Sequence, residues 1–136
     1  MQRIESKVKK GELLHFIVRR GDFVPGRVDL IGPDNFLQCS MLSMEKGKTF
    51  RPHKHIWHDT DDYARAQESW VVIKGIVKAI YYDINDKIIL ETLLYEGDAS
   101  FTLDGGHNYE IMENDTRVLE YKTGPYFGQE KDKTFI

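Results

Sequence analysis

Short apolar segments separated by turn residues run along most of this chain. They recur about every ten residues and contain almost no pattern at the helical spacing of three to four. Glycine, aspartate and asparagine stand between them, as in the hairpin signal at 83–87. This pattern is typical of an antiparallel all-β sandwich or barrel. The predicted strands cover residues 3–8, 13–18, 27–31, 36–44, 49–55, 69–73, 76–82, 88–95, 99–103, 109–112 and 118–122.

Two segments fall outside this pattern. Residues 56–67 are rich in acidic and aromatic side chains and predict a loop or one helical turn. Residues 124–136 contain an early Pro-Tyr-Phe-Gly stretch and then a charged run, so we expect an extended or loosely packed tail. No linker-like stretch interrupts the chain. We therefore expect a single domain over residues 1–136, with its core barrel at about 36–122 and both terminal segments packed on it.

Composition narrows the class of protein. The chain has 136 residues, 40% of them hydrophobic, with 19 basic and 22 acidic side chains and a net charge of −3. That length can bury a substantial core, and the absence of a basic block argues against a nucleic-acid partner. No apolar run reaches the ~18 residues that span a bilayer, and we see no signal peptide. The single cysteine, Cys39, predicts a buried thiol in a reducing cytoplasm.

Two histidines, His53 and His55, lie two residues apart on a predicted strand. Side chains at this spacing point to the same face, so both imidazoles can reach one ion. Glu68 stands at the head of an apolar strand, and His107 follows a glycine pair. Three imidazoles and one carboxylate form a plausible ligand set for a metal ion, with room for water or substrate. The alternative is that the two histidines of the strand are surface residues without a ligand role.

These residues resemble the first motif of the cupin superfamily. That motif runs glycine, five residues, His-x-His, a short gap, glutamate, six residues and glycine. The gap between His55 and Glu68 is twelve residues here, where the family usually has three or four, so Gln67 or a carboxylate of the insertion competes as the third ligand. The matching residues are Gly47, His53, His55, Glu68 and Gly75.

The second cupin motif is degenerate in this sequence. Gly97 and Gly105 fit it, but Leu103 replaces a proline, His107 comes one residue early and a later asparagine is missing. The Gly-Gly-His stretch and residues 122–126 also resemble small single-domain cupins associated with bacterial polysaccharide biosynthesis. The resemblance implies a double-stranded β-helix, a jelly-roll barrel that holds one divalent transition metal (Fe, Mn, Ni or Zn) near one mouth. The ligands that it implies are His53, His55, Glu68 and His107.

Other residues are candidates for substrate binding and proton transfer. His58 and the nearby carboxylates Asp59, Asp61 and Asp62 could supply a general base or a further ligand, or could form a solvated acidic loop. Arg51, on the strand face of the two histidines, could hold an anionic group or lie at the surface. Aromatic faces suit sugars, although Trp70 is more typical of a core. The candidate substrate-binding residues are Arg51, Trp57, Tyr63 and Lys122, and the candidate catalytic residues are His58 and Tyr126.

The sequence favours a metal-dependent enzyme of the isomerase, epimerase or oxygenase type. Its substrate would be a small carbohydrate-like or carboxylated molecule. Two alternatives stay open: a small-ligand-binding module without turnover, and a metal-free sugar-nucleotide isomerase that uses His53 and a tyrosine as acid and base. Barrels of this size commonly pair through an edge strand or exchange N-terminal strands, so we expect a homodimer.

Overall fold

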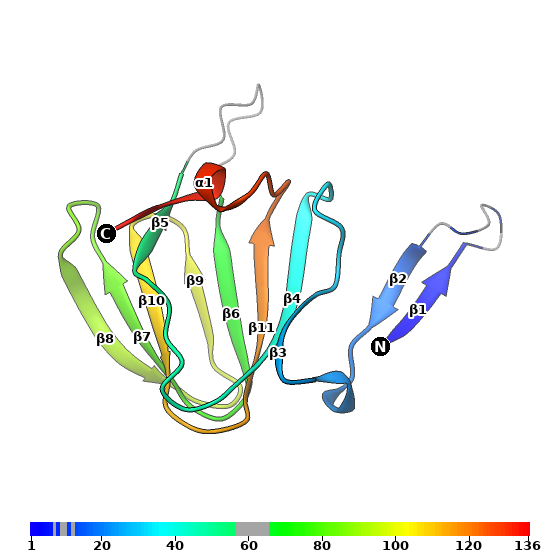
Figure 1. Cartoon of the computed structure of the whole chain (residues 1–136), viewed down its shortest axis with the longest axis horizontal. Helices are drawn as coiled ribbons and strands as arrows, with labels where there is room; N and C mark the ends of the chain where they lie inside the picture. Colours follow the sequence, from blue (N-terminus) through cyan, green and yellow to red (C-terminus); the bar gives the residue numbers. More distant parts are fainter. Residues whose placement is uncertain (7, 9–10, 12, 57–65) are drawn as a thin grey trace.

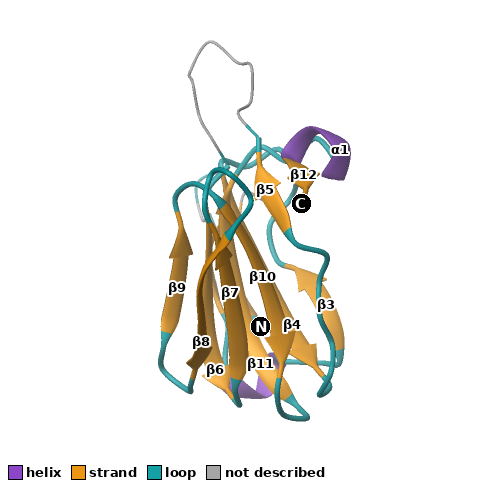
Figure 2. Ribbon diagram, turned by 90° about the vertical axis from the view of Figure 1, so that its left-hand side faces the viewer, coloured by secondary structure: helices purple, strands orange, loops and turns teal. Residues whose placement is uncertain are grey.

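Two five-stranded sheets face each other in the computed structural model, which describes residues 1–6, 8, 11, 13–56 and 66–136 (Figures 1 and 2). The first sheet has the order β12-β5-β10-β7-β8 and the second the order β3-β4-β11-β6-β9, and neighbouring strands pair antiparallel. The predicted all-β class is therefore confirmed. The strands of the first sheet are Lys133–Phe135, His53–His55, Gly106–Ile111, Val77–Tyr82 and Ile88–Leu94, and those of the second are Gly26–Asp29, Leu37–Met44, Thr116–Thr123, Glu68–Lys74 and Ala99–Thr102.

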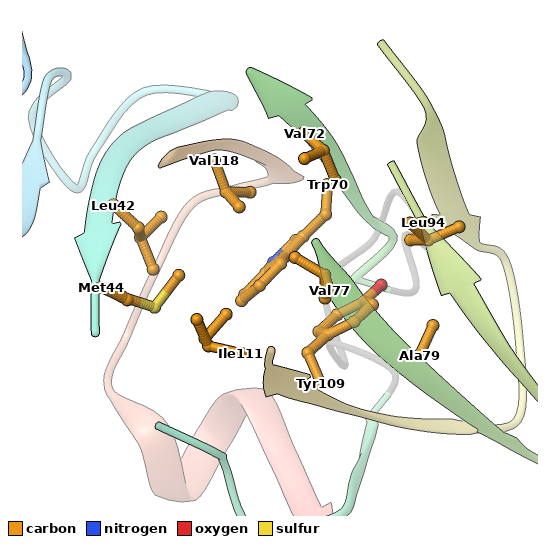
Figure 3. Close-up of a cluster of buried hydrophobic side chains, with 10 residues drawn as sticks. All are labelled: Leu42, Met44, Trp70, Val72, Val77, Ala79, Leu94, Tyr109, Ile111 and Val118. Atoms are coloured by element: carbon orange, nitrogen blue, oxygen red, sulfur yellow. The ribbon is translucent and has the colours of Figure 1, made fainter. Parts of the chain in front are cut away.

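The hydrophobic core lies between the two sheets (Figure 3). Alternate side chains of a strand point to the same face, so every second residue of the central strands is buried. Trp70 lies at the centre, stacked on Tyr109 with ring centroids 4.1 Å apart and met edge-on by Phe50 at 5.4 Å. The buried members of this cluster are Leu42, Met44, Trp70, Val72, Val77, Ala79, Leu94, Tyr109, Ile111 and Val118.

Inward-facing positions change from apolar to polar towards one end of the barrel. On β6 the order is Val72, Trp70 and then Glu68, and on β10 it is Ile111, Tyr109 and then His107. Strands β4 and β11 follow the same rule, with Leu42 and Val118 in the core and polar side chains beyond them. One end of the barrel interior is therefore a hydrophobic floor, and the other is a polar mouth.

The N-terminal strands β1 (Gln2–Glu5) and β2 (Leu13–Ile17) form a separate two-stranded antiparallel hairpin. It lies to one side of the barrel (Figure 1). A short 3-10 helix, η1 (Arg20–Asp22), leads from it to β3. On the outer face of β4, Cys39 is buried, as the sequence predicts, in a small second cluster with Leu30 and Met41.

The C-terminal tail differs from the expected loose segment. It forms a one-turn helix, α1 (Gln129–Asp132), followed by β12, which pairs with β5. The backbone N–H of Ile136 donates to the Pro52 carbonyl at 3.1 Å, and that of Ile56 donates to the Asp132 carbonyl at 3.0 Å. Strand β5, which begins just after Pro52, therefore has neighbours on both sides, β10 and β12. No helix in the described part of the chain is long and apolar enough to cross a membrane.

Candidate metal centre

Four buried side chains meet at the polar mouth of the barrel. His53 and His55 come from β5, Glu68 from the first position of β6 and His107 from β10. One potential ligand atom from each lies within 4.8 Å of the others. Strand β10 begins at Gly106, three residues before the predicted start, and this extension places His107 directly opposite His53 in the sheet. The structure thus brings together the four residues singled out from the sequence.

Glu68 lies between two of the imidazoles. Its Oε1 is 3.2 Å from His107 Nε2, and its Oε2 is 3.3 Å from His55 Nε2. Burial opposes ionisation of this carboxyl group, but the contacts with His107 and His55 outweigh it and hold the pKa of Glu68 well below its usual range. Glu68 is therefore a carboxylate at neutral pH, the form in which it can bind a cation.

Two of the three imidazoles, those of His53 and His55, have an oxygen partner at the ring nitrogen that faces away from the centre. His53 Nδ1 is 2.9 Å from the Arg51 carbonyl oxygen and donates to it, which leaves the Nε2 lone pair for the cavity. His55 Nδ1 is 3.4 Å from Asp132 Oδ2. Carbonyl and carboxylate partners of this kind hold the rings of metal-binding histidines in position and fix their tautomers.

The two histidines of β5 titrate in opposite directions. Burial, together with the charges of His107 and Lys133, lowers the pKa of His53 to about 4. Burial also acts against a charge on His55, but Asp132 and Glu68 overcome it and raise the pKa of His55 to about 9. At neutral pH the metal-free protein therefore holds a neutral His53 and a protonated His55, which must release its proton before it can bind a metal ion.

Asp132, from the last turn of α1, is a site residue that the sequence reasoning missed. The side chain is almost fully buried, and its Oδ2 contacts His55 Nδ1 and, at 3.1 Å, Lys122 Nζ. Burial raises its pKa, but His55 and Lys122 outweigh this effect and lower the pKa to about 2. In the sequence, Asp132 stands in a charged run beside Glu130 and Lys131, and nothing local separates it from these exposed neighbours.

A cavity of about 540 Å³ adjoins the cluster and reaches across the barrel. His53 and Glu68 form part of its wall, so the candidate metal centre opens directly onto it. Lys133 reaches into this wall from β12, with its Nζ 3.2 Å from His53 Nε2. Charged and aromatic side chains alternate around the remainder, chiefly Arg27, Asp29, Phe50, Trp70, Tyr109, Glu120, Lys122 and Tyr126.

An ion pair between the exposed Arg27 and the buried Glu120 forms another part of the cavity wall. Arg27 Nη2 lies 2.8 Å from Glu120 Oε1, and Arg27 Nε lies 2.8 Å from Asp29 Oδ1. The second oxygen of Glu120 accepts a hydrogen bond from Trp70 Nε1 at 3.1 Å. Burial and the charge of Glu68 raise the pKa of Glu120, and Arg27 opposes this rise. The sequence reasoning missed this pair as well, because β3 and β11 are distant in the chain.

The residues predicted to bind substrate or transfer protons differ in where they lie relative to the cavity. Lys122 lines the cavity, with its Nζ bonded to Asp132 and 4.0 Å from the centre of the Tyr126 ring. Tyr126 lies at the rim and is partly exposed. Arg51 is exposed, with its guanidinium 4.1 Å from the centre of the Phe135 ring, and it lines a further cavity of about 420 Å³ together with His53 and Lys133. Predicted residues Trp57, His58 and Tyr63, and the carboxylates Asp59, Asp61 and Asp62, lie outside the described residues.

The donor set fits a divalent transition metal. Within the described residues, the Nε2 atoms of His55 and His107 are buried and make no hydrogen bond, although they lie 3.3 and 3.2 Å from the oxygens of Glu68. Buried polar atoms are almost always paired, so imidazole nitrogens gathered around one carboxylate without a hydrogen bond fit a partner of positive charge. Three imidazoles and one carboxylate suit Fe, Mn, Ni or Zn alike, and so they do not identify the metal.

Comparison with known proteins establishes the fold. No protein-family model matches the sequence, and neither does any curated protein. Among solved structures, KdgF from Halomonas sp. is 21% identical, with a TM-score of 0.55 over 75% of this chain and 83% of that one. Oxalate oxidase is 15% identical (TM-score 0.56, 74% and 46%), and CapF with the inhibitor 3-isopropenyl-tropolone is 19% identical (TM-score 0.64, 96% and 36%). This chain thus spans less than half the length of the latter two. The likeness confirms the double-stranded β-helix fold of the cupins.

Proposed function

We propose that this protein is a metal-dependent enzyme that acts on a small carbohydrate-like or carboxylated substrate. One divalent transition metal would be held by His53, His55, Glu68 and His107. The observation that carries the proposal is the position of this cluster, which is buried on one side and open on the other to a cavity large enough for a substrate. A purely structural histidine cluster has no need of such a cavity.

When bound, a divalent ion would act as a Lewis acid on a carbonyl or enolate oxygen or, if it is Fe(II), would support chemistry with dioxygen. The protein side chains have separate tasks around it. The Arg51 carbonyl group and Asp132 orient two of the imidazoles, and aromatic side chains form part of the cavity wall against which a substrate would pack. Tyr126 at the rim, together with His58, is the candidate for moving a proton to or from the substrate.

Cavity size and lining support the substrate class. A volume of about 540 Å³ lies in the usual range for small-molecule sites, roughly 300–1,000 Å³, and exceeds the volume of a two-carbon acid. The faces of Phe50, Trp70, Tyr109 and Tyr126 suit a ring, and the three cationic side chains of the lining suit an acidic group. The similarity to oxalate oxidase, an enzyme named for a dicarboxylate, supports the carboxylated alternative.

The remaining expectations belong to the same proposal. A homodimer is supported by strand β8, which ends its sheet and exposes Ile88, Ile89 and Leu90. A single domain is supported by the one core between the two sheets. The single free cysteine supports a cytoplasmic location. A role in polysaccharide biosynthesis is supported by the sequence resemblance described above.

Metal content is the first test. Protein purified without a histidine tag would be compared with His53→Ala/His55→Ala by elemental analysis, with His15→Ala, on β2 of the hairpin, as the matched control. We expect about one equivalent of metal in the wild type and the control, and none in the double variant. Metal at a hundred times its Kd should stabilise the wild type by about 2.7 kcal/mol. No bound metal, and no stabilisation by added Fe, Mn, Ni or Zn, would refute the proposal.

Turnover is the second test, because metal binding alone does not distinguish an enzyme from a binding module. Metal-loaded wild type would be incubated with a panel of sugar acids, keto acids and sugar nucleotides, and products would be followed by NMR. We expect conversion of at least one acidic compound, and its loss after removal of the metal with EDTA. Binding of a compound without conversion would instead favour the non-catalytic module, and conversion that survives EDTA would favour the metal-free isomerase.

A further inference from the structure

We propose that Lys133 binds the carboxylate of the substrate directly beside the metal ion, and that the protein therefore selects anionic ligands. This inference rests on the proposed metal site and goes beyond it by assigning a substrate-binding residue in the C-terminal tail. Lys133 is the first residue of β12 and pairs with His55 of β5. The tail therefore delivers a cation to the wall of the cavity.

The position of the Lys133 ammonium group is the central observation. Its Nζ lies 3.2 Å from His53 Nε2. The other ring nitrogen of His53 donates to the Arg51 carbonyl, so Nε2 is the atom whose lone pair would face a metal ion. The ammonium group thus occupies the position next to the place where an ion would bind, and it does so at the open side of the cluster.

Lys133 differs from the other cations of the cavity in its partners. Arg27 is held by two carboxylates, those of Asp29 and Glu120, and Lys122 is held by Asp132. Within the described residues, the polar side-chain partner of Lys133 is the His53 ring, and no carboxylate lies within ion-pair distance of its Nζ. Its charge is therefore available to a ligand in a way that the charges of the other two are not.

Metal binding must break the contact between Lys133 and His53. A lone pair that is donated to a metal ion can no longer accept a hydrogen bond from an ammonium group, and the two cations repel each other across a short distance. A carboxylate relieves both problems, because one oxygen can face the metal ion while the other accepts a charge-assisted hydrogen bond from Lys133. A neutral ligand at the same position would leave the repulsion in place.

Two effects of opposite sign follow for Lys133→Met. Loss of the competing, like-charged ammonium group should strengthen metal binding. Loss of the anion partner should weaken carboxylate binding to the metal-loaded protein by about ten- to a hundred-fold, as expected for one charge-assisted hydrogen bond. Replacing a residue with only a structural role would weaken both metal binding and carboxylate binding. Opposite changes in these two affinities therefore distinguish the proposed role from a structural one.

The experiment uses the full chain with Co²⁺ as the metal and glycolate as the probe. Calorimetry would measure Co²⁺ affinity of the metal-free protein, and the visible spectrum of the Co²⁺-loaded protein would follow titration with glycolate and with its neutral amide, glycolamide. The matched control is Lys131→Met, two residues away on the exposed side of α1. Lys133→Arg keeps the positive charge and tests whether another cation at this position restores glycolate binding. Thermal denaturation of each variant would show that it is folded.

We expect the wild type and Lys131→Met to bind glycolate more tightly than glycolamide. In Lys133→Met, Co²⁺ affinity should rise and glycolate affinity should fall at least ten-fold, with glycolamide unaffected, and Lys133→Arg should recover most of the loss. Unchanged glycolate affinity, or a parallel fall in Co²⁺ affinity, would overturn this inference while the proposed metal site stood. Absence of Co²⁺ binding by the wild type would overturn the metal site and this inference together.

Discussion

The metal-free protein should lose stability as the pH rises above neutral, and replacing Asp132 by asparagine should make this loss smaller. The loss arises from His55, whose pKa is about 9 in the folded protein against an unfolded value of about 6.5. A raised histidine pKa stabilises the folded state fully below pH 6.5, and this contribution disappears as the pH rises through 9. The difference between the two pKa values corresponds to about 3 kcal/mol of unfolding free energy.

Asparagine has nearly the same shape as aspartate but lacks its charge. The contact of Asp132 with His55 Nδ1 is the largest single influence that raises the pKa of His55, and Glu68 supplies the remainder. We therefore expect the decline in stability between pH 6.5 and 9 to shrink from about 3 to about 1.5 kcal/mol in Asp132→Asn. The control is Glu130→Gln, an exposed carboxylate on the same helical turn, which should leave the decline unchanged.

The assay is urea denaturation of EDTA-treated protein at closely spaced pH values from 6 to 9.5. Other groups that titrate in this range are common to all three proteins, so the difference between their curves isolates the contribution of Asp132. Asp132→Asn will also lower the stability at pH 6.5, so the quantity to compare is the slope of stability with pH rather than its absolute value. Parallel curves for the wild type and Asp132→Asn would refute the assignment of Asp132 as the partner of His55.

Urea denaturation extended down to pH 3 should show a slope of opposite sign on the acidic side. Burial lowers the pKa of His53 to about 4, so between pH 4 and 6.5 the unfolded chain binds more protons than the folded one, and stability rises with pH. Asp132, with a pKa of about 2, adds a rise at lower pH that is complete above the unfolded value of 3.8. The stability of the metal-free protein is therefore expected to peak near pH 6.5.

Three further substitutions test the packing around the site. Trp70→Phe removes the hydrogen bond to Glu120 and part of the core, and should cost about 2–3 kcal/mol in urea denaturation; a cost below about 1 kcal/mol would contradict the central role of the indole. Arg27→Met leaves Glu120 without its cation, which is partly screened by solvent, and should cost about 1 kcal/mol at pH 7. Most of that loss should return in Arg27→Met/Glu120→Gln, and a double variant no more stable than the single one would count against the pair. Gly106→Ala places a Cβ against Ile136 Cδ1 and should expose the tail to trypsin; unchanged digestion would argue against tight docking.

Local sequence signals were sufficient to predict most of the fold. Alternation of apolar and polar residues, bounded by glycine, aspartate and asparagine, is a property of neighbouring positions, and each predicted strand has a counterpart in the structure. The candidate metal cluster was also predictable, because His53 and His55 share a face for the same local reason. Adding Glu68 and His107 required the resemblance to the cupin motifs, since no local rule places strands β6 and β10 beside β5.

The errors share a physical cause, which is that burial depends on contacts distant in sequence. Arg51 could not be placed by alternation alone, because β5 begins only at His53 and Arg51 precedes it, exposed and next to Phe135. Asp132 and Lys133 looked like members of a solvated charged run. Their positions are set by the pairing of β12 with β5, about eighty residues earlier in the chain.

The tail has a structural and a chemical task that cannot be separated. Without β12, strand β5 would be a sheet edge, with unpaired backbone groups next to the candidate metal ligands. The pairing that covers this edge also fixes Asp132 at His55 and Lys133 at His53. The barrel supplies the four candidate ligands, whereas the tail supplies the charges that set their protonation and face the ligand. Changes in ligand preference are therefore expected to follow substitutions in the tail more closely than substitutions in the hydrophobic floor of the barrel.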